Sequence, residues 1–379
     1  MNNIVSFAQR VLDRFGTRPL YSVDSLILSW LSYMYLPEEY EEARGWDGSI
    51  KLSDLYHAEH FPVLFRETWD PENSLLLLSA MAANPRYRDM RITGFTEITD
   101  PEAEKQFAAM TFLLPGGGAY IAYRGTDMSL VGWKEDFNMS FRYPIPAQEE
   151  ALKYLEEAAS RVEGRLYVGG HSKGGNLAVY AAANAEEELR DRIVRVFSHD
   201  GPGFPEKVWK SAQYLSLLPK LEKTLPQSSI VGLLLDHREA LRVVKSNVLV
   251  NTIWQHNPFT WLIEDGDFCD QERLTKKAEF MDHTLDQWLA ELSEKDRQKF
   301  FGVLFSLLET NGTKSLTELR TDWKSNIPSV VKALQDLDPE IRSFLLGTLK
   351  ELAALGVRYL PELFRPDVQL KLPELPLKF

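Results

Sequence analysis

Residues 165–178 read Arg-Leu-Tyr-Val-Gly-Gly-His-Ser-Lys-Gly-Gly-Asn-Leu-Ala, and this stretch decides the fold. Its first residues are aliphatic and aromatic, which predicts a strand, and the alanine-rich residues that follow it predict a helix. Between them lies Gly170-His171-Ser172-Lys173-Gly174, the Gly-x-Ser-x-Gly pattern that holds a nucleophilic serine on a sharp strand-to-helix turn. The sequence therefore predicts that Ser172 is a catalytic nucleophile.

The glycines of this turn have a physical purpose. Gly170 and Gly174 lack the side chains that would clash where strand and helix approach closely, and a nucleophile on such a turn has strained backbone angles. The N-terminus of the following helix favours negative charge near Ser172. The alternative interpretation is a structural turn that happens to contain a serine. A phosphate-binding loop is excluded, because no Gly-Lys-Ser/Thr occurs at the required spacing.

The segments around the turn alternate between strand and helix patterns. Strands are predicted at 91–98, 107–114, 119–123, 165–169, 193–198, 230–235 and 248–254, and helices at 148–162 and 176–189. A glycine-rich loop at 115–118 joins two of the strands as a hairpin. This alternation predicts an α/β fold, with a mostly parallel sheet and helices on both of its faces.

Helical patterns flank this core on both sides. Residues 1–90 are expected to form a helical segment packed on the core, residues 91–275 the core itself, and residues 276–379 a helical extension. In the extension, Ser293 with Asp296 and the later pair Asp338-Pro339 predict the starts of two helices, and Gly356 predicts the end of the second.

Two sequence blocks carry a resemblance to known proteins. Residues 170–178 form the first, and the second is Tyr-Arg-Gly-Thr at 123–126, followed by Trp133 and Asp136. Together these blocks resemble the class 3 lipases of the α/β-hydrolase fold, and more closely an uncharacterised bacterial family related to them. The resemblance covers about residues 90–270 and implies an α/β-hydrolase-type sheet.

The resemblance also implies an oxyanion hole. In class 3 lipases the strand that ends in Arg-Gly-Thr or Arg-Gly-Ser provides one donor from its last residue, which here is Thr126. The second donor would be the backbone N–H of Lys173. Two such donors contribute ~2–4 kcal/mol each of transition-state stabilisation. The alternative for Thr126 is a strand-end residue that turns the chain, and Trp133 and Asp136 are expected to pack beneath this loop.

This sequence departs from the class 3 lipases in two ways. Lys173 stands where they usually have an apolar residue, so its charge suggests an anionic feature on the substrate. The chain also continues to Phe379, whereas class 3 lipases end soon after their histidine. The additional helices are expected to cover the site, bind a partner or form an oligomer interface.

A nucleophilic serine needs a base within hydrogen-bond reach and a carboxylate that orients this base. In α/β-hydrolases the acid and then the histidine follow the serine in the chain. His256 is the predicted base, because it starts a loop directly after the strand predicted at 248–254. Asp236, at the end of the preceding predicted strand, is the predicted acid. Asp200, which follows the strand predicted at 193–198, remains the alternative acid, although its Gly and Pro neighbours also suit a simple turn.

Composition limits the partners. The formal net charge of −12 disfavours nucleic acid and anionic lipid surfaces. The single cysteine allows no intrachain disulfide, and neither a secretion signal nor a membrane-spanning stretch is expected, so we expect a cytoplasmic protein. No metal or cofactor is required.

The sequence thus predicts a serine hydrolase that acts on an ester, thioester or lipid-like acyl bond of a small molecule. The alternative is a hydrolase scaffold that has lost turnover and serves in binding or regulation, because fold alone does not determine function.

Overall fold

A computed structural model describes the chain except for residues 1, 128, 236–237, 250–252, 310–322 and 361–379. Eight strands form one sheet in the order β1-β2-β3-β4-β5-β6-β7-β8. They are β1 Ile50–Lys51, β2 Arg91–Asp100, β3 Lys105–Leu113, β4 Ala119–Tyr123, β5 Leu166–His171, β6 Ile193–His199, β7 Leu221–Pro226 and β8 Leu241–Val244. The first four pair antiparallel, and β4 to β8 pair parallel. The predicted α/β-hydrolase-type fold is confirmed.

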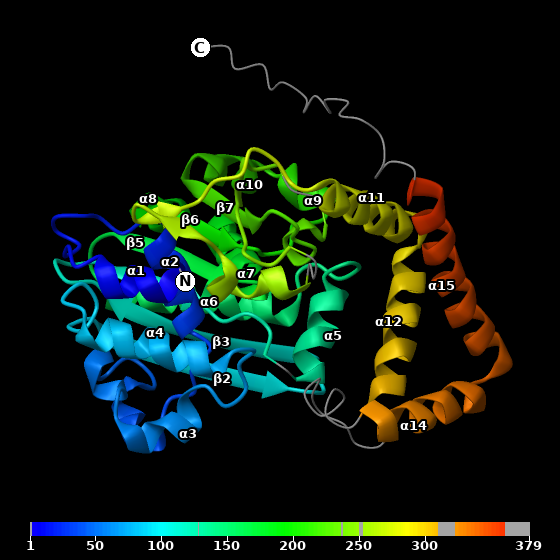
Figure 1. Ribbon diagram of the computed structural model, residues 1–379, viewed down its shortest axis with the longest axis horizontal. Coiled ribbons are helices and arrows are strands. Elements are labelled where there is room, and N and C mark those ends of the chain that lie inside the picture. The colour runs from blue at the N-terminus through cyan, green and yellow to red at the C-terminus, as the bar shows by residue number, and fades with distance from the viewer. Residues whose placement is uncertain (1, 128, 236–237, 250–252, 310–322, 361–379) are drawn as a thin grey trace, which may run out of the picture.

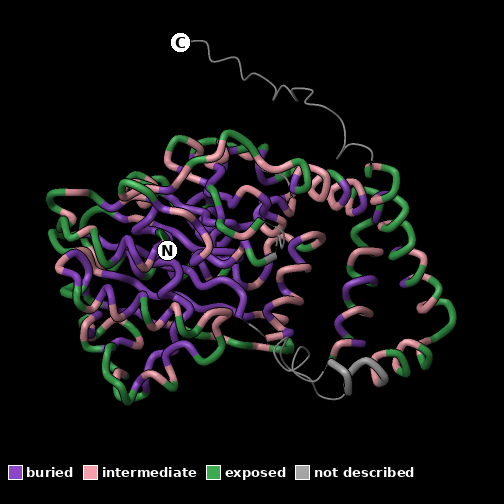
Figure 2. The backbone as a smooth tube through the Cα atoms, viewed as in Figure 1, coloured by how far each residue is buried: buried purple, intermediate pink, exposed green. Residues whose placement is uncertain are grey.

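Helices cover both faces of this sheet (Figure 1). The helices among the described residues are α1 Ile4–Arg10, α2 Ser22–Leu31, α3 Phe61–Leu64, α4 Pro71–Ala83, α5 Leu130–Asn138, α6 Pro146–Arg161, α7 Lys173–Asn184, α8 Glu187–Arg192, α9 Glu206–Trp209, α10 Ala212–Leu217, α11 Lys276–Glu291, α12 Glu294–Leu308, α14 Trp323–Asp336 and α15 Pro339–Tyr359. Of these, α12, α14 and α15 stand beside the sheet and do not cover it (Figure 1). A small ribbon, β9 Ile263–Glu264 with β10 Asp267–Phe268, follows the sheet. Figure 2 shows that the buried residues concentrate in the sheet and in the helices packed on it.

Two apolar cores lie on opposite faces of the sheet. On one face α6 and α7 pack against the central strands, and α7 is almost wholly buried because alanine and glycine dominate it. On the other face α2 packs against β4 and β5, with α1 and α4 outside it. The N-terminal helices therefore share a core with the sheet, whereas the division of the chain at residues 90 and 275 stays a prediction.

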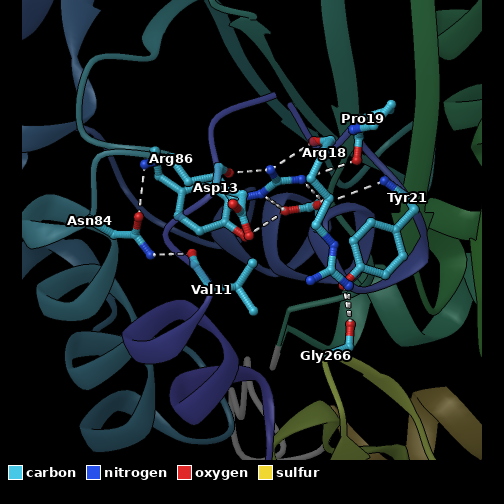
Figure 3. Close-up of polar contacts among 10 residues, drawn as sticks. Val11, Asp13, Arg18, Pro19, Tyr21, Asn84, Arg86 and Gly266 are labelled. Atoms are coloured by element: carbon cyan, nitrogen blue, oxygen red, sulfur yellow. Dashed lines mark hydrogen bonds and ion pairs between the residues drawn. The ribbon is translucent and has the colours of Figure 1, made fainter. Parts of the chain in front are cut away.

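A buried ion pair fixes the N-terminal segment (Figure 3). The Arg86 guanidinium donates to both carboxylate oxygens of Asp24, at 2.8 and 2.6 Å, and both side chains are fully buried. It also donates to the backbone carbonyls of Asp13, Arg18 and Pro19. Because these carbonyls belong to an irregular loop, Arg86 supplies the hydrogen bonds that no helix or strand provides there.

The C-terminal helices form a third cluster. Helix α12 packs against α5, where the rings of Phe137 and Phe301 stack with centroids 4.6 Å apart. Helices α11 and α12 both pack against α15. Ser293 and Asp338 cap α12 and α15 as predicted, but α15 continues past Gly356 to Tyr359. A Cβ atom at Gly356 would meet no atom within 4 Å, so close packing does not require glycine at that position.

Two strand predictions were wrong. Instead of a strand at 230–235, Val231–Leu233 forms a single 3₁₀ turn, and the true strands on either side are β7 and β8. Residues 248 and 249 lie in no strand, residues 250–252 lie outside the described part, and Ile253–His256 is a 3₁₀ turn. An apolar run alone does not distinguish a strand from a buried turn.

Candidate active site

The serine turn has the predicted strand–turn–helix structure. Strand β5 ends at His171 and helix α7 begins at Lys173, so Ser172 stands alone between them. Its φ of 60° and ψ of −135° are strained values for a residue with a side chain. Its backbone N–H donates to the carbonyl of His199 at 2.9 Å, which fixes the turn against the end of β6.

Close packing explains both glycines of the motif. A Cβ atom at Gly170 would lie 2.1 Å from the carbonyl carbon of Gly174. A Cβ atom at Gly174 would lie 2.1 Å from the backbone oxygen of Tyr123, in the neighbouring strand β4. Since real Cβ contacts are not this short, any larger residue at either position would push the turn away from the sheet.

A histidine and a carboxylate meet beside this turn. His256 Nδ1 lies 2.7 Å from Asp200 Oδ2, and the Asp200 side chain is buried. The other oxygen of Asp200 accepts hydrogen bonds from the Ser229 hydroxyl and, at 3.1 Å, from the Gly232 N–H. A carboxylate only accepts, so Nδ1 carries the proton and Nε2 is the basic nitrogen of His256. The alternative acid of the sequence analysis thus contacts the predicted base, while Asp236 lies outside the described residues.

His171 connects the nucleophile turn to the His256 loop. Its Nε2 lies 2.8 Å from the backbone carbonyl of His256, and its Nδ1 lies 3.1 Å from the hydroxyl of Tyr33. The carbonyl can only accept, so Nε2 donates to it and Nδ1 accepts from Tyr33. Burial holds the pKa of His171 well below its usual range, so the ring is neutral in this position. Sequence reasoning missed Tyr33, because only the fold brings the end of α2 to the turn.

One pocket joins these groups. Ser172 and His256 both line it, together with Thr126 and Lys173, the two predicted oxyanion-hole residues. Within the described part of the chain no hydrogen bond joins Ser172 to His256. Such contacts are often long in a free enzyme and tighten when substrate binds. The structure therefore brings the predicted nucleophile, the predicted base and both predicted oxyanion-hole residues to one cavity.

Helix α5 contacts both predicted oxyanion-hole residues. The Thr126 hydroxyl donates to Asp136 Oδ2 at 2.5 Å. Lys173 Nζ donates to Glu135 Oε2, to Gln106 O and to Gln106 Oε1, each at 2.9 Å. Adjacent carboxylates on one helix thus restrain both Thr126 and Lys173.

The ammonium of Lys173 is not available to a substrate. Its side chain is 1% exposed, and every contact described above is internal. Burial lowers the pKa of Lys173, but the Glu135 and Asp136 carboxylates outweigh this effect and hold the pKa above its ordinary value. The charge of Lys173 therefore gives no reason to expect an anionic feature on the substrate, because Glu135 neutralises it.

Asp136 has an unusual protonation equilibrium. Burial raises its pKa to about 6, although the nearby Lys173 ammonium and the Thr126 hydroxyl favour the charged form. Its Oδ1 has no hydrogen-bond partner among the described residues. Trp133 lines the pocket as well, so both residues border the cavity instead of only packing beneath the loop.

The described residues include no group of three or more histidine, cysteine or carboxylate side chains placed to hold a metal ion. Within the same described ranges, no helix combines the length and the apolar character needed to cross a bilayer.

Comparison with known proteins places the chain in a wider context. A family model described as Mbeg1-like matches residues 81–306, which include Ser172, Asp200 and His256. A search of curated protein sequences finds no match. Among solved structures, the chain is similar to a native Rhizomucor miehei lipase propeptide complex at 17% identity, with a TM-score of 0.32 over 48% of this chain and 68% of that one. It is similar to an M37 lipase at 18% identity, with a TM-score of 0.34 over 56% of this chain and 70% of that one.

Proposed function

The chain belongs to the Mbeg1-like family, and from its pocket we propose that it is a lipase-like serine hydrolase that cleaves an acyl ester or thioester. The observation that carries this proposal is the His256–Asp200 pair at 2.7 Å, in a pocket that the strained Ser172 also lines. A buried carboxylate that orients a histidine beside a serine on a tight turn is the arrangement that activates a hydroxyl for acyl transfer.

Each residue then has a definite task. Ser172 Oγ attacks the carbonyl carbon and passes its proton to His256 Nε2, while Asp200 stabilises the imidazolium that forms. The backbone N–H groups of Thr126 and Lys173 donate to the oxyanion. The tetrahedral intermediate expels the alcohol or thiol, which takes the proton from His256, and leaves an acyl group on Ser172. Water, deprotonated by His256, then releases the carboxylic acid and restores the serine.

We assign the acid role to Asp200 in place of Asp236. The distance to His256 supports this assignment, and so do the two hydrogen bonds that Asp200 receives from Ser229 and Gly232. These two donors leave Oδ2 free to accept from the imidazole. Asp236 remains the competing candidate, and substitution of each carboxylate separates the two.

A second candidate function is a binding protein that retains the scaffold without turnover. The observation that favours it is the missing hydrogen bond between Ser172 and His256 within the described residues. This candidate predicts a serine without enhanced reactivity, whereas the hydrolase predicts one that reacts with acylating probes.

A fluorophosphonate probe tests the proposal directly. We expect wild-type protein to be labelled at Ser172, which peptide mapping locates, and Ser172→Ala to lose the label. Ser140→Ala is the matched control, because Ser140 lines the same pocket but its hydroxyl donates to the Phe137 carbonyl. We expect this control to label like wild type. Folded wild-type protein that fails to react at Ser172 would reject the hydrolase and favour the binding protein.

A further inference from the structure

The C-terminal helices provide one wall of the Ser172 pocket. Leu285, Trp288 and Leu289 line it from α11, at the three- and four-residue spacing that places side chains on one face of a helix. Phe301 lines it from α12. These residues lie more than a hundred positions after Ser172 in the sequence, and only the fold brings them to the nucleophile.

The opposite wall is helix α5 and the residues after it. Trp133, Phe137 and Ser140 line the pocket from this side, and α5 begins close to the oxyanion residue Thr126. The space between the two walls therefore starts at the catalytic groups and runs along a helix. Its lining residues on α5 run from Trp133 to Phe137, about 6 Å at 1.5 Å of rise per residue, and the stacked rings of Phe137 and Phe301 close the space between α5 and α12 at that point.

Charge is confined to one end of this space. The charged or titratable lining residues are Tyr33, Asp136, His171, Lys173 and His256, and each belongs to or contacts the segments around Ser172 and Thr126. Lys173 directs its ammonium to Glu135 and Gln106, away from the pocket. The wall made by α11 and α12 presents only aliphatic and aromatic groups among the described residues. An uncharged, apolar and elongated ligand matches these surfaces.

Several contacts hold this wall in place. The stacked rings of Phe137 and Phe301 join α5 to α12. Arg297 of α12 donates to the Ser140 carbonyl at 2.5 Å. The Trp288 indole N–H donates to the Thr348 carbonyl of α15 at 3.2 Å, so its ring is fixed in orientation. The wall is thus built from restrained side chains, which gives the space between the helices a defined length.

We propose that this apolar space between α5 and the α11–α12 wall binds the alkyl chain of the acyl group and limits its length. The inference rests on the proposed function, because it places the acyl carbonyl at Ser172. The C-terminal helices therefore select the substrate, while the triad performs the chemistry. The substrate class is an acyl ester or thioester with an uncharged alkyl chain of limited length.

A series of p-nitrophenyl esters from acetate to dodecanoate measures the length. Burying one methylene favours binding about fourfold, so kcat/KM is expected to rise by up to about fourfold per methylene until the alkyl chain fills the space. Beyond this length the rise should stop, because further methylenes leave the space. A profile that is flat or falls from acetate onward would overturn the inference.

Leu289→Ala tests the wall itself. We expect the ratio of octanoate to acetate hydrolysis to fall about tenfold, since acetate serves as the reference within each variant. Leu304→Ala is the matched control, because Leu304 is equally half-buried in the same helical cluster but does not line the pocket. The control should keep the wild-type ratio. Equal ratios in the two variants would assign the wall a structural role only.

Leu285→Trp is a second, filling variant that leaves the apolar cluster intact. The larger side chain should occupy part of the space and move the best substrate to a shorter chain. An unchanged chain-length profile in this variant would contradict the proposed path of the alkyl chain.

Binding without turnover separates this inference from the proposed function. Octanoate is titrated into Ser172→Ala and followed by tryptophan fluorescence, because Trp133 and Trp288 line the space. We expect saturable octanoate binding that acetate does not reproduce and that an additional Leu289→Ala change weakens. If the wild-type protein neither hydrolyses esters nor reacts with fluorophosphonate but octanoate still binds, only the proposed function fails. If esters are hydrolysed and octanoate binds no better than acetate, only the wall assignment fails.

Discussion

Asparagine in place of Asp200 is the substitution that most directly examines the triad. The side chain is buried, and asparagine has nearly the same shape, so the site keeps its packing. The asparagine oxygen can still accept from Ser229 and Gly232, but its NH₂ group then faces His256 Nδ1. An NH₂ group only donates, so Nδ1 must accept and the proton moves to Nε2. His256 then has no basic nitrogen for Ser172.

The size of the effect follows from this change of tautomer. We expect Asp200→Asn to lower kcat/KM by about 10³- to 10⁴-fold, the loss typical of this substitution in serine triads. This corresponds to about 4–5.5 kcal/mol of transition-state stabilisation. The loss should appear in both ester hydrolysis and the rate of fluorophosphonate labelling, because both begin with attack by Ser172.

Asp236→Asn is the matched control, and we expect it to retain activity within a few fold of wild type. The urea midpoint of each variant establishes that it is folded under assay conditions. A loss of less than tenfold in Asp200→Asn, or an equal loss in Asp236→Asn, would refute the assignment of Asp200 as the acid.

Three further predictions concern stability. Burial lowers the pKa of His199 to about 3, against about 6.5 in an unfolded chain. Between these pH values the unfolded state binds a proton that the folded state lacks. The free energy of unfolding therefore falls as the pH falls through this window. His199→Gln removes this titrating group and should reduce the slope of the free energy of unfolding against pH by the equivalent of about one proton. Urea unfolding between pH 4 and 6 measures this slope, and an unchanged slope would contradict the prediction. Arg86→Met leaves the buried Asp24 carboxylate unpaired and should lower the free energy of unfolding by about 3–5 kcal/mol; a loss under 1 kcal/mol would show that the pair is not buried in solution. Lys173→Met leaves the buried Glu135 carboxylate without its ionic partner and should cause a similar loss of stability. Adding Glu135→Gln removes this unpaired charge and should recover most of the loss, as measured by urea unfolding of the double variant. A double variant that is no more stable than Lys173→Met would argue against the ion pair.

Local sequence patterns predicted the centre of the fold well. The Ser172 turn, the hairpin of β3 and β4 and the flanking helices α6 and α7 all lie where their residues indicated. These elements depend on short-range preferences, such as glycines at a tight turn and apolar residues on one helix face, which a sequence displays directly.

Strands β7 and β8 were missed because their burial depends on distant partners. Lys223 lies in the middle of β7 and looks like a surface residue, but it is buried and pairs with Glu239 at 3.4 Å. The apolar run that was predicted as a strand instead passes over Asp200, where Gly232 allows a close approach. The same misplaced strand was the reason that Asp236 was the predicted acid and Asp200 only the alternative.

Other parts of the site leave no local signal at all. Tyr33 contacts His171 from the N-terminal helices, and Leu289 reaches the pocket from the C-terminal ones. Neither residue belongs to a motif, and each acts only through its place in the folded chain. A single sequence therefore indicates the candidate nucleophile more readily than the residues that line the pocket around it.

The separation between the serine turn and the α11–α12 wall has an evolutionary consequence. The groups assigned to bond cleavage lie between residues 126 and 256, whereas this wall begins only at residue 276. Mutations in the wall can therefore change which molecules fit without altering the groups that break the bond. Related proteins can therefore differ in substrate preference while they keep the same catalytic groups. For the same reason, the C-terminal helices can be exchanged between related proteins as one unit.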